Sequence, residues 1–124
     1  MNLNQVTIPV SELQQSIHFY TQLGLRLIVN SPHYARFECP TGDATFSLHH
    51  VENYANSAPG AWIYFELENL DHTVTELSNK GFVFETQPED MSWLWREARL
   101  KDPDGHQIIL YFAGDNRKNP PWRI

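Results

Sequence analysis

The chain repeats one pattern of secondary structure, and this repeat limits the possible folds more than any other feature. Gly24 and Gly81 lie 57 residues apart, and the same shift places Leu13 on Leu70. An apolar helix face and the glycine that follows the helix therefore recur in both halves of the chain. We interpret the chain as two successive β-α-β-β-β modules.

The first module opens with a strand and a helix. Residues 5–10 alternate as strand residues do, and Ser11 with Gln14 has the spacing of a capping box. We predict a helix that begins at Ser11 and ends at Gly24, because apolar residues recur between them at three- and four-residue steps. Further strands are expected at 25–30, 33–39 and 44–51.

The second module follows a segment rich in chain breakers, residues 52–60, which we interpret as a linker. Its turn at 103–105 repeats the turn of the first module at 40–42, since both begin with proline and end with glycine. A helix is expected near 70–80, and strands are expected near 82–87, 94–101 and 106–112.

Together the two modules predict an α+β fold. We expect a single domain over residues 1–114, with its modules at 3–51 and 61–113. The remaining residues, 115–124, are expected to form an extended tail, because the two consecutive prolines within them cannot continue a helix.

Charge and composition indicate what the protein binds. Of its 124 residues, 15 are acidic and 9 are basic, so the formal net charge is -6. Neutralising phosphates takes clustered Lys and Arg, so this acid excess argues against nucleic acid and anionic membrane surfaces as partners and favours a small molecule. The longest apolar run, residues 108–113, is too short to cross a bilayer.

The cysteine content and the amino terminus bear on the location of the protein. Cys39 is the single cysteine and cannot form a disulfide within the chain. Residues 1–5 lack the basic start and the apolar stretch of a signal peptide. We therefore expect a cytoplasmic protein.

Two passages resemble the vicinal oxygen chelate superfamily, which includes glyoxalase I, extradiol dioxygenases and bleomycin-resistance proteins. The first passage reads QVTIPVSEL from Gln5 and continues through SIHFY to LGL at 23–25, and the second reads KDPDGHQIILY from Lys101. With the matching repeat, the similarity covers residues 3–113. It implies a curved eight-stranded mixed sheet around a cavity for a small molecule, in chains that commonly form homodimers.

The same resemblance implies a divalent metal held by four side chains. The four positions fall here on Gln5, Ser47, Trp62 and Ile109. Of these residues only Gln5 matches a ligand known in some glyoxalase I enzymes, and the apolar side chains offer no lone pair to a cation. A displaced metal centre built on Gln5, His49 and Glu66 is an open alternative, because alternate strand residues share a face.

His49 and Glu66 are also candidates for catalysis without a metal. A carboxylate in a mostly apolar cavity binds a proton more tightly, and a nearby imidazole can share that proton. Such a pair suits proton abstraction next to a carbonyl. The alternative is structural: Glu66 pairs with Arg99 or Arg96 in the cavity wall, since an unpaired buried carboxylate is costly.

Aromatic side chains and one arginine are the expected ligand contacts. In the stretch 92–100, strand alternation places Trp95, Glu97 and Arg99 on one side. Arg99 either holds a ligand carboxylate or phosphate, or is a solvated rim charge beside Glu97 and Lys101. The candidate substrate-binding residues are Gln5, Ser47, Trp62, Tyr64, Trp95, Arg99 and Tyr111.

Two hypotheses about function follow. The first is an enzyme that acts on a small organic molecule by lyase- or isomerase-type acid/base chemistry, with Glu66 and His49 as the working groups. The second is a non-catalytic protein that binds or sequesters an aromatic or cationic compound, as the resistance proteins of the superfamily do. The enzyme needs Glu66 or His49 for turnover, whereas the binding protein needs the aromatic walls.

Overall fold

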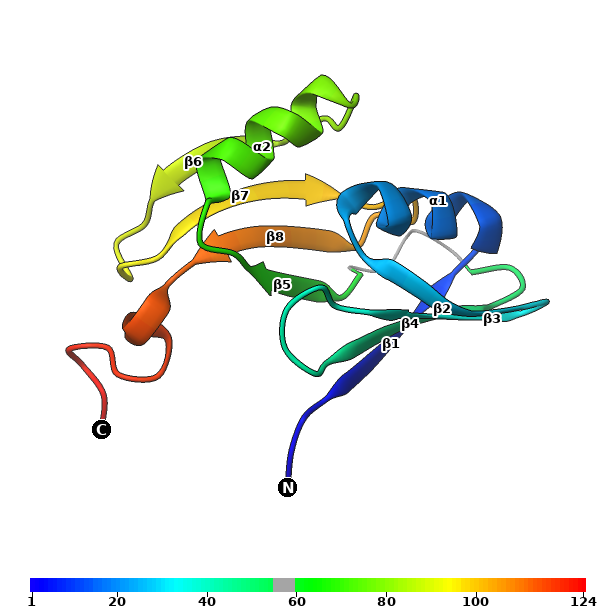
Figure 1. Cartoon of the computed structure of the whole chain (residues 1–124), viewed down its shortest axis with the longest axis horizontal. Coiled ribbons are helices and arrows are strands. Elements are labelled where there is room, and N and C mark those ends of the chain that lie inside the picture. Colours follow the sequence, from blue (N-terminus) through cyan, green and yellow to red (C-terminus); the bar gives the residue numbers. More distant parts are fainter. Residues whose placement is uncertain (55–59) are drawn as a thin grey trace. The chain divides into compact units, whose positions relative to one another are not determined.

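The computed structural model describes residues 1–54 and 60–124, so most of the expected linker lies outside the described residues. The chain divides into two compact units, each of which is described by itself. Unit 1 comprises Met1–Gly60 and Asp102–Gly105, and unit 2 comprises Ala61–Lys101 and His106–Ile124. Each unit has one four-stranded sheet and one α-helix, in the order β-α-β-β-β along the chain (Figure 1). The predicted α+β class and its repeat are confirmed.

Unit 1 is a mixed sheet with a helix on one face. Its elements are β1 (Gln5–Val10), α1 (Leu13–Leu23), β2 (Arg26–Ser31), β3 (Tyr34–Glu38) and β4 (Thr45–His50). The strand order is β1-β4-β3-β2, with β1 parallel to β4 and the other pairs antiparallel. Alternate strand residues form the core under α1, among them the buried Ile8, Val10, Phe37 and Leu48.

Helix α1 begins later than the sequence predicts. Its N-cap is Glu12, whose side chain makes no capping hydrogen bond, and its first residue is Leu13. The predicted capping box does not form, because the Ser11 hydroxyl donates to Asp104 Oδ1 at 2.5 Å. The end of the helix is as predicted: Gly24 has a φ of +123°, and its N–H bonds to carbonyls of the last turn.

The turn at 102–105 belongs to unit 1 and is hydrogen-bonded to the end of β1 and to α1. Asp104 accepts hydrogen bonds from the Ser11 N–H, at 3.1 Å to each carboxylate oxygen. Asp102 accepts a hydrogen bond of 2.7 Å from Tyr20 Oη. The glycine of the turn has a φ of +85°, which side chains rarely tolerate. The Asp-Pro-Asp-Gly sequence therefore serves the fold of unit 1.

Unit 2 repeats this arrangement. Its elements are β5 (Trp62–Glu66), α2 (Leu70–Asn79), β6 (Thr86–Asp90), β7 (Arg96–Lys101), β8 (Gln107–Phe112) and the 3₁₀ helix η1 (Gly114–Arg117). The strand order is β5-β8-β7-β6, with β5 parallel to β8. Leu70, Val74 and Leu77 of α2 are buried, and the helix lies over one face of the sheet (Figure 1).

The sequence predicts a strand that begins near residue 82, whereas β6 begins at Thr86. The Phe82 N–H bonds back to the Leu77 carbonyl at 3.1 Å, so the chain is still closing α2 at that point. Pro88 has no N–H to donate, and the register with β7 shifts between Thr86 and Glu89. Because β6 is an edge strand, it tolerates the proline.

The carboxyl-terminal tail is not extended from its start. Gly114–Arg117 forms η1. The two prolines at 120–121 lie beyond the end of this helix, so they do not interrupt it. Side-chain hydrogen bonds at four-residue spacing then connect Asp115, Asn119 and Arg123.

Both α-helices are short, with 11 and 10 residues, and no helix within residues 1–54 and 60–124 is long and apolar enough to cross a membrane.

Candidate functional site

The open face of each sheet, opposite its helix, carries the residues that the sequence predicts as a site. In unit 1 these residues are Gln5, Ser47 and His49. In unit 2 they are Trp62, Tyr64, Glu66, Trp95, Arg99 and Tyr111. Strand alternation produces both sets, because residues opposite each other in paired strands share a face. The two sets lie on different units, so the pairing of His49 with Glu66 stays a prediction.

Three aromatic rings of unit 2 form one cluster. Trp95 stacks on Tyr111, with ring centroids 4.7 Å apart and an interplanar angle of 25°. Tyr64 meets both rings edge-on, with its centroid 6.0 Å from that of Trp95 and 5.6 Å from that of Tyr111. Tyr111 is 6% exposed and Tyr64 is 42% exposed, so the cluster has a buried base and an accessible rim. Burial, followed by the charge of Glu66, raises the pKa of Tyr111.

Trp62 lies on the same strand face as Tyr64 and is 58% exposed. The Arg99 guanidinium carbon lies 5.0 Å from the centroid of the Trp62 ring, within the range of a cation–π contact. The open face of unit 2 thus presents a large, exposed indole ring with a guanidinium group over it.

Glu97 lies on this face beside Trp95 and Arg99, as strand alternation predicts, but the sequence does not predict its role as a buried partner of Arg99. It is 1% exposed, and its Oε1 accepts two hydrogen bonds from Arg99, at 2.9 Å from Nε and 2.8 Å from Nη2. A buried partner excludes the alternative that Arg99 is only a solvated rim charge. The burial of Glu97 opposite Tyr111 depends on the register of β7 with β8, which strand alternation alone does not give.

Glu66 is bound to the start of the tail. Its Oε2 accepts hydrogen bonds from the backbone N–H groups of Ala113 and Gly114, both at 2.9 Å. Its Oε1 lies 3.6 Å from Arg117 Nε. The carboxylate therefore holds the end of β8 and the beginning of η1, and both of its oxygens are engaged.

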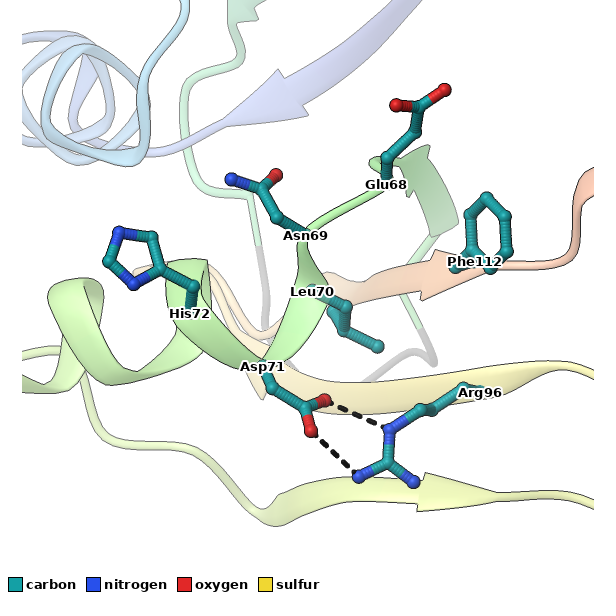
Figure 2. A pocket seen from close by; sticks show the side chains of 7 residues that line it. All are labelled: Glu68, Asn69, Leu70, Asp71, His72, Arg96 and Phe112. Carbon is teal, nitrogen blue, oxygen red and sulfur yellow. Dashed lines mark hydrogen bonds and ion pairs between the residues drawn. The ribbon is translucent and has the colours of Figure 1, made fainter.

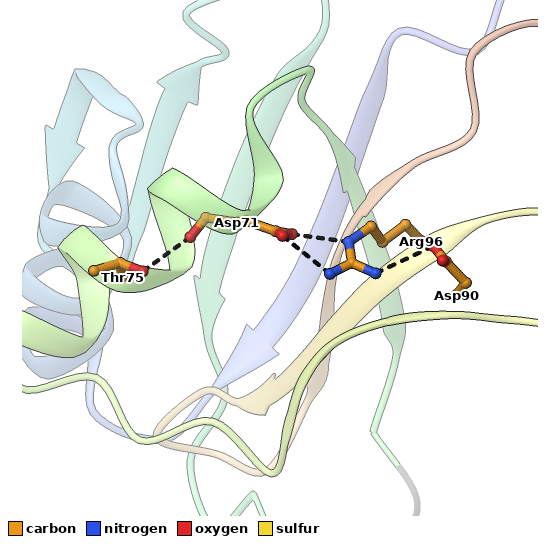
Figure 3. A network of polar contacts seen from close by, with 4 residues as sticks. All are labelled: Asp71, Thr75, Asp90 and Arg96. Carbon is orange, nitrogen blue, oxygen red and sulfur yellow. Dashed lines mark hydrogen bonds and ion pairs between the residues drawn. The ribbon is translucent and has the colours of Figure 1, made fainter.

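The predicted ion pairs of Glu66 with Arg99 or Arg96 are wrong. Arg99 binds the carboxylate next to it on β7, as described above. Arg96 lies on the helix side of the sheet, where its Nε and Nη2 donate to the two carboxylate oxygens of Asp71 at 2.9 and 3.0 Å. Its Nη1 donates to Asp90 at 3.2 Å (Figure 3). The hydrogen bonds that Asp71 accepts from Arg96 lower the pKa of Asp71.

A hollow of about 270 Å³ lies at the start of α2 (Figure 2). Its lining residues are Glu68, Asn69, Leu70, Asp71, His72, Arg96 and Phe112. None of the predicted ligand contacts is among them. The Arg96 guanidinium points at Asp71, which neutralises it, so the hollow does not favour an anionic ligand (Figure 2).

In unit 1, Ser47 belongs to a hydrogen-bonded cluster. Its buried Oγ lies 2.7 Å from Tyr34 Oη, which also accepts a hydrogen bond of 2.9 Å from Arg36 Nε. Burial alone would raise the pKa of Tyr34. Hydrogen bonds with Ser47 and Arg36, together with the positive charge of Arg36, outweigh burial and hold this pKa below its usual 10.0. His49 is exposed and lies opposite Tyr34 in the register of β3 with β4.

The four positions implied as metal ligands do not form a donor set. Trp62 and Ile109 supply no lone pair for a divalent cation, and the Ser47 hydroxyl is engaged in the cluster just described. Gln5 Oε1 accepts a hydrogen bond of 2.8 Å from Thr45 Oγ1. Among the residues that the structure describes, no three His, Cys, Asp or Glu side chains lie together as a metal site requires. The residues present do not fit the family's metal.

Comparison with family models gives one match that covers most of the chain. The model of the Glyoxalase/Bleomycin resistance protein/Dioxygenase superfamily matches residues 2–110. The chain therefore belongs to this superfamily, as its two sequence passages and its paired β-α-β-β-β units indicate.

Three similar proteins illustrate the relationship. An uncharacterized protein of Bacillus subtilis, YraH, is 30% identical over an alignment of 127 positions that covers 90% of this chain and 98% of that protein. The crystal structure of a glyoxalase/bleomycin resistance protein/dioxygenase from Nocardioides has a TM-score of 0.80 at 22% identity, over 100% of this chain and 89% of the other. A bleomycin-binding protein complexed with bleomycin has a TM-score of 0.72 at 18% identity, over 90% and 98% of the two chains. At these identities the two structures bear on the fold alone.

Proposed function

We propose that the protein binds a small organic molecule that carries a planar aromatic ring, and that the binding surface is the open face of the β5-β8-β7-β6 sheet. The observation that carries this proposal is the exposure of large rings there. Trp62 and Tyr64 are 58% and 42% exposed on neighbouring positions of one strand face. Exposed aromatic rings are typical of surfaces that stack a ligand.

The two rings that Tyr64 contacts are well placed to hold a ligand rigidly. Trp95 and Tyr111 are already stacked on each other, so the surface loses little conformational freedom when a further ring packs against it. The structurally similar bleomycin-binding protein also takes a small molecule. The likeness indicates that this fold can hold a small molecule.

The acid/base role of Glu66 has less support than binding. A general base must be free to take a proton from the substrate, whereas both oxygens of Glu66 are engaged by Ala113, Gly114 and Arg117. Within residues 1–54 and 60–124, the positions that the resemblance implies as metal ligands form no complete donor set. We therefore favour the binding protein over the lyase or isomerase.

Three probes that share one ring system test the proposal. They are 2-naphthamidine, 2-naphthamide and 2-naphthoate, which carry a cationic, a neutral and an anionic group. We expect at least one of them to bind, and Trp62→Ala and Tyr64→Ala to weaken its binding about tenfold each, since a lost stacking contact is worth about 1 kcal/mol or more. Equilibrium dialysis measures the affinities.

Trp122→Ala is the matched control, because Trp122 is 57% exposed but lies in the tail. The Trp122→Ala variant should bind the same probe with the affinity of the wild type. Failure of all three probes to bind, or equal losses in the Trp62 and Trp122 variants, would show that the aromatic face is not the binding surface.

A further inference from the structure

We propose that Glu97 selects ligands that bring a positively charged N–H group to the aromatic face, so that the natural ligand is an aromatic ring that carries an ammonium or amidinium group. This inference rests on the proposed function, because it names the ligand class of the same surface. It assigns the selection to a buried side chain and not to the exposed rings.

The first argument is the incomplete pairing of Glu97. Its Oε1 accepts both hydrogen bonds from Arg99, and its Oε2 has no hydrogen-bond partner among residues 1–54 and 60–124. In the part of the chain that the structure describes, Ser16 Oγ of unit 1 is the other buried side-chain atom without a partner, and of the two only Oε2 belongs to a carboxylate. A buried carboxylate oxygen without a donor is costly, and a ligand N–H would remove that cost.

The second argument is the excess of carboxylates in one row of the sheet. The strand registers place Glu66 opposite Tyr111, Tyr111 opposite Glu97, and Glu97 opposite Glu89. Directly opposite residues share a face, so three carboxylates follow one line across four strands. Arg99 and Arg117 are the cations paired with this row. The row is therefore one positive charge short.

The third argument is the nature of the surface around the row. The faces of Trp62, Tyr64 and Trp95 carry the negative side of the aromatic quadrupole, which attracts cations. The net charge of -6 adds a long-range attraction of the same sign. A neutral or anionic aromatic ligand would gain the stacking but not these electrostatic contributions.

Arg99 does not take the place of such a ligand. Its two donors converge on one oxygen of Glu97, and its guanidinium is held over the Trp62 ring. Its side chain is 24% exposed, so the pair lies at the edge of solvent and not in the deep core. Because Oε2 itself is covered in the free protein, a small displacement of a covering side chain accompanies binding.

The naphthalene probes test this selection. We expect the wild type to bind 2-naphthamidine at least about tenfold more tightly than 2-naphthamide, and Glu97→Gln to bring the ratio of these two affinities, measured on the same variant, close to one. Glu89→Gln is the matched control, because it removes an exposed carboxylate from the same row. It should keep most of the preference.

Folding of each variant is checked by circular dichroism before binding is measured. If Glu97→Gln does not fold, Glu97→Asp keeps the charge that pairs with Arg99 but withdraws it from the ligand, and it should also lose the preference. Equal affinities of the wild type for the amidine and the amide, or a preference that survives in the folded Glu97 variant, would overturn the selection by Glu97 and leave ring binding intact. Binding of none of the probes would overturn the proposed function itself.

Discussion

Tyr20 connects α1 to the 102–105 turn through a single hydroxyl group. Its ring is fully buried, 4.8 Å from the ring of Phe46 and 6.2 Å from that of Phe37, measured between centroids. Burial raises the pKa of Tyr20 well above 10.0, and the negative charge of Asp102 and the hydrogen bond to it raise this pKa further. The folded protein therefore keeps this phenol protonated at alkaline pH.

Replacing Tyr20 with Phe removes that hydrogen bond. We expect the free energy of unfolding to fall by about 1–3 kcal/mol at pH 8, because a buried hydrogen bond to a charged group is lost. The raised pKa of Tyr20 contributes fully to the free energy of unfolding below pH 10, where the unfolded tyrosine is still protonated. This contribution is lost as the pH rises from there toward the folded-state pKa. Urea unfolding between pH 8 and 11 measures both effects.

The alkaline loss of stability should be shallower in Tyr20→Phe than in the wild type, since the variant has no phenol at this position. Parallel pH profiles of the two proteins would show that Tyr20 does not carry the alkaline sensitivity.

In the same unit, Tyr34 has a pKa that is shifted in the opposite direction from that of Tyr20. Its burial is outweighed by hydrogen bonds with Ser47 and Arg36, and its pKa is lowered. We expect the tyrosinate absorbance of the folded protein to show an early phase below pH 10, which Tyr34→Phe removes. The lowered pKa of Tyr34 adds to the free energy of unfolding above the unfolded-state pKa of about 10. This contribution is lost as the pH falls through the folded-state pKa. An early phase that persists in Tyr34→Phe would assign it to another residue.

At the scale of elements, one carboxylate connects the end of the second sheet to the tail. Glu66 on β5 accepts the N–H groups of Ala113 and Gly114, which join β8 to η1. Its side chain is 32% exposed, so solvent screens part of this interaction. The residue is thereby assigned a structural role.

Replacing Glu66 with Gln tests that role. We expect faster hydrogen exchange at the amides of Ala113 and Gly114, a loss of stability below about 1 kcal/mol, and unchanged affinity for the neutral probe, 2-naphthamide. If Glu66→Gln abolished binding or a measured turnover while exchange at these amides stayed slow, the acid/base hypothesis would regain its support.

The elements also show why the fold is predictable from this sequence and the site is not. Apolar spacing and Gly24 are local features, and they predict the helix end that is observed. The start of α1 is misplaced because the hydroxyl of Ser11 is taken by Asp104, a residue 93 positions away. Strand alternation does place Glu97 beside Arg99, two residues away on β7. The burial of Glu97 depends on strand register, which no local pattern encodes.

At the scale of the whole molecule, the repeat produces two units of the same topology with different surfaces. The open face of the first sheet is polar, with Tyr34, Arg36 and Ser47 in one cluster. The open face of the second sheet is aromatic, with a row of carboxylates across it. One topology thus carries two chemically different open faces, of which the aromatic one is the proposed binding surface.

Association of two chains is a further expectation at this scale, since homodimers are common in the superfamily that the sequence resembles. We expect light scattering during gel filtration to give twice the mass of one chain at micromolar concentration. A monomer mass that persists as the concentration is raised would contradict a homodimer.

The central claim is that the open face of the β5-β8-β7-β6 sheet binds a planar ligand, and the indole N–H signals test it most directly. The chain has four tryptophans, of which Trp62 and Trp95 lie on that face, whereas Trp93 and Trp122 lie in a turn and in the tail. In a ¹⁵N-correlated NMR spectrum, saturating 2-naphthamidine should shift the indole signals of Trp62 and Trp95 and leave the other two in place. Shifts confined to Trp93 or Trp122, or no shift of any indole signal at saturation, would contradict the claim.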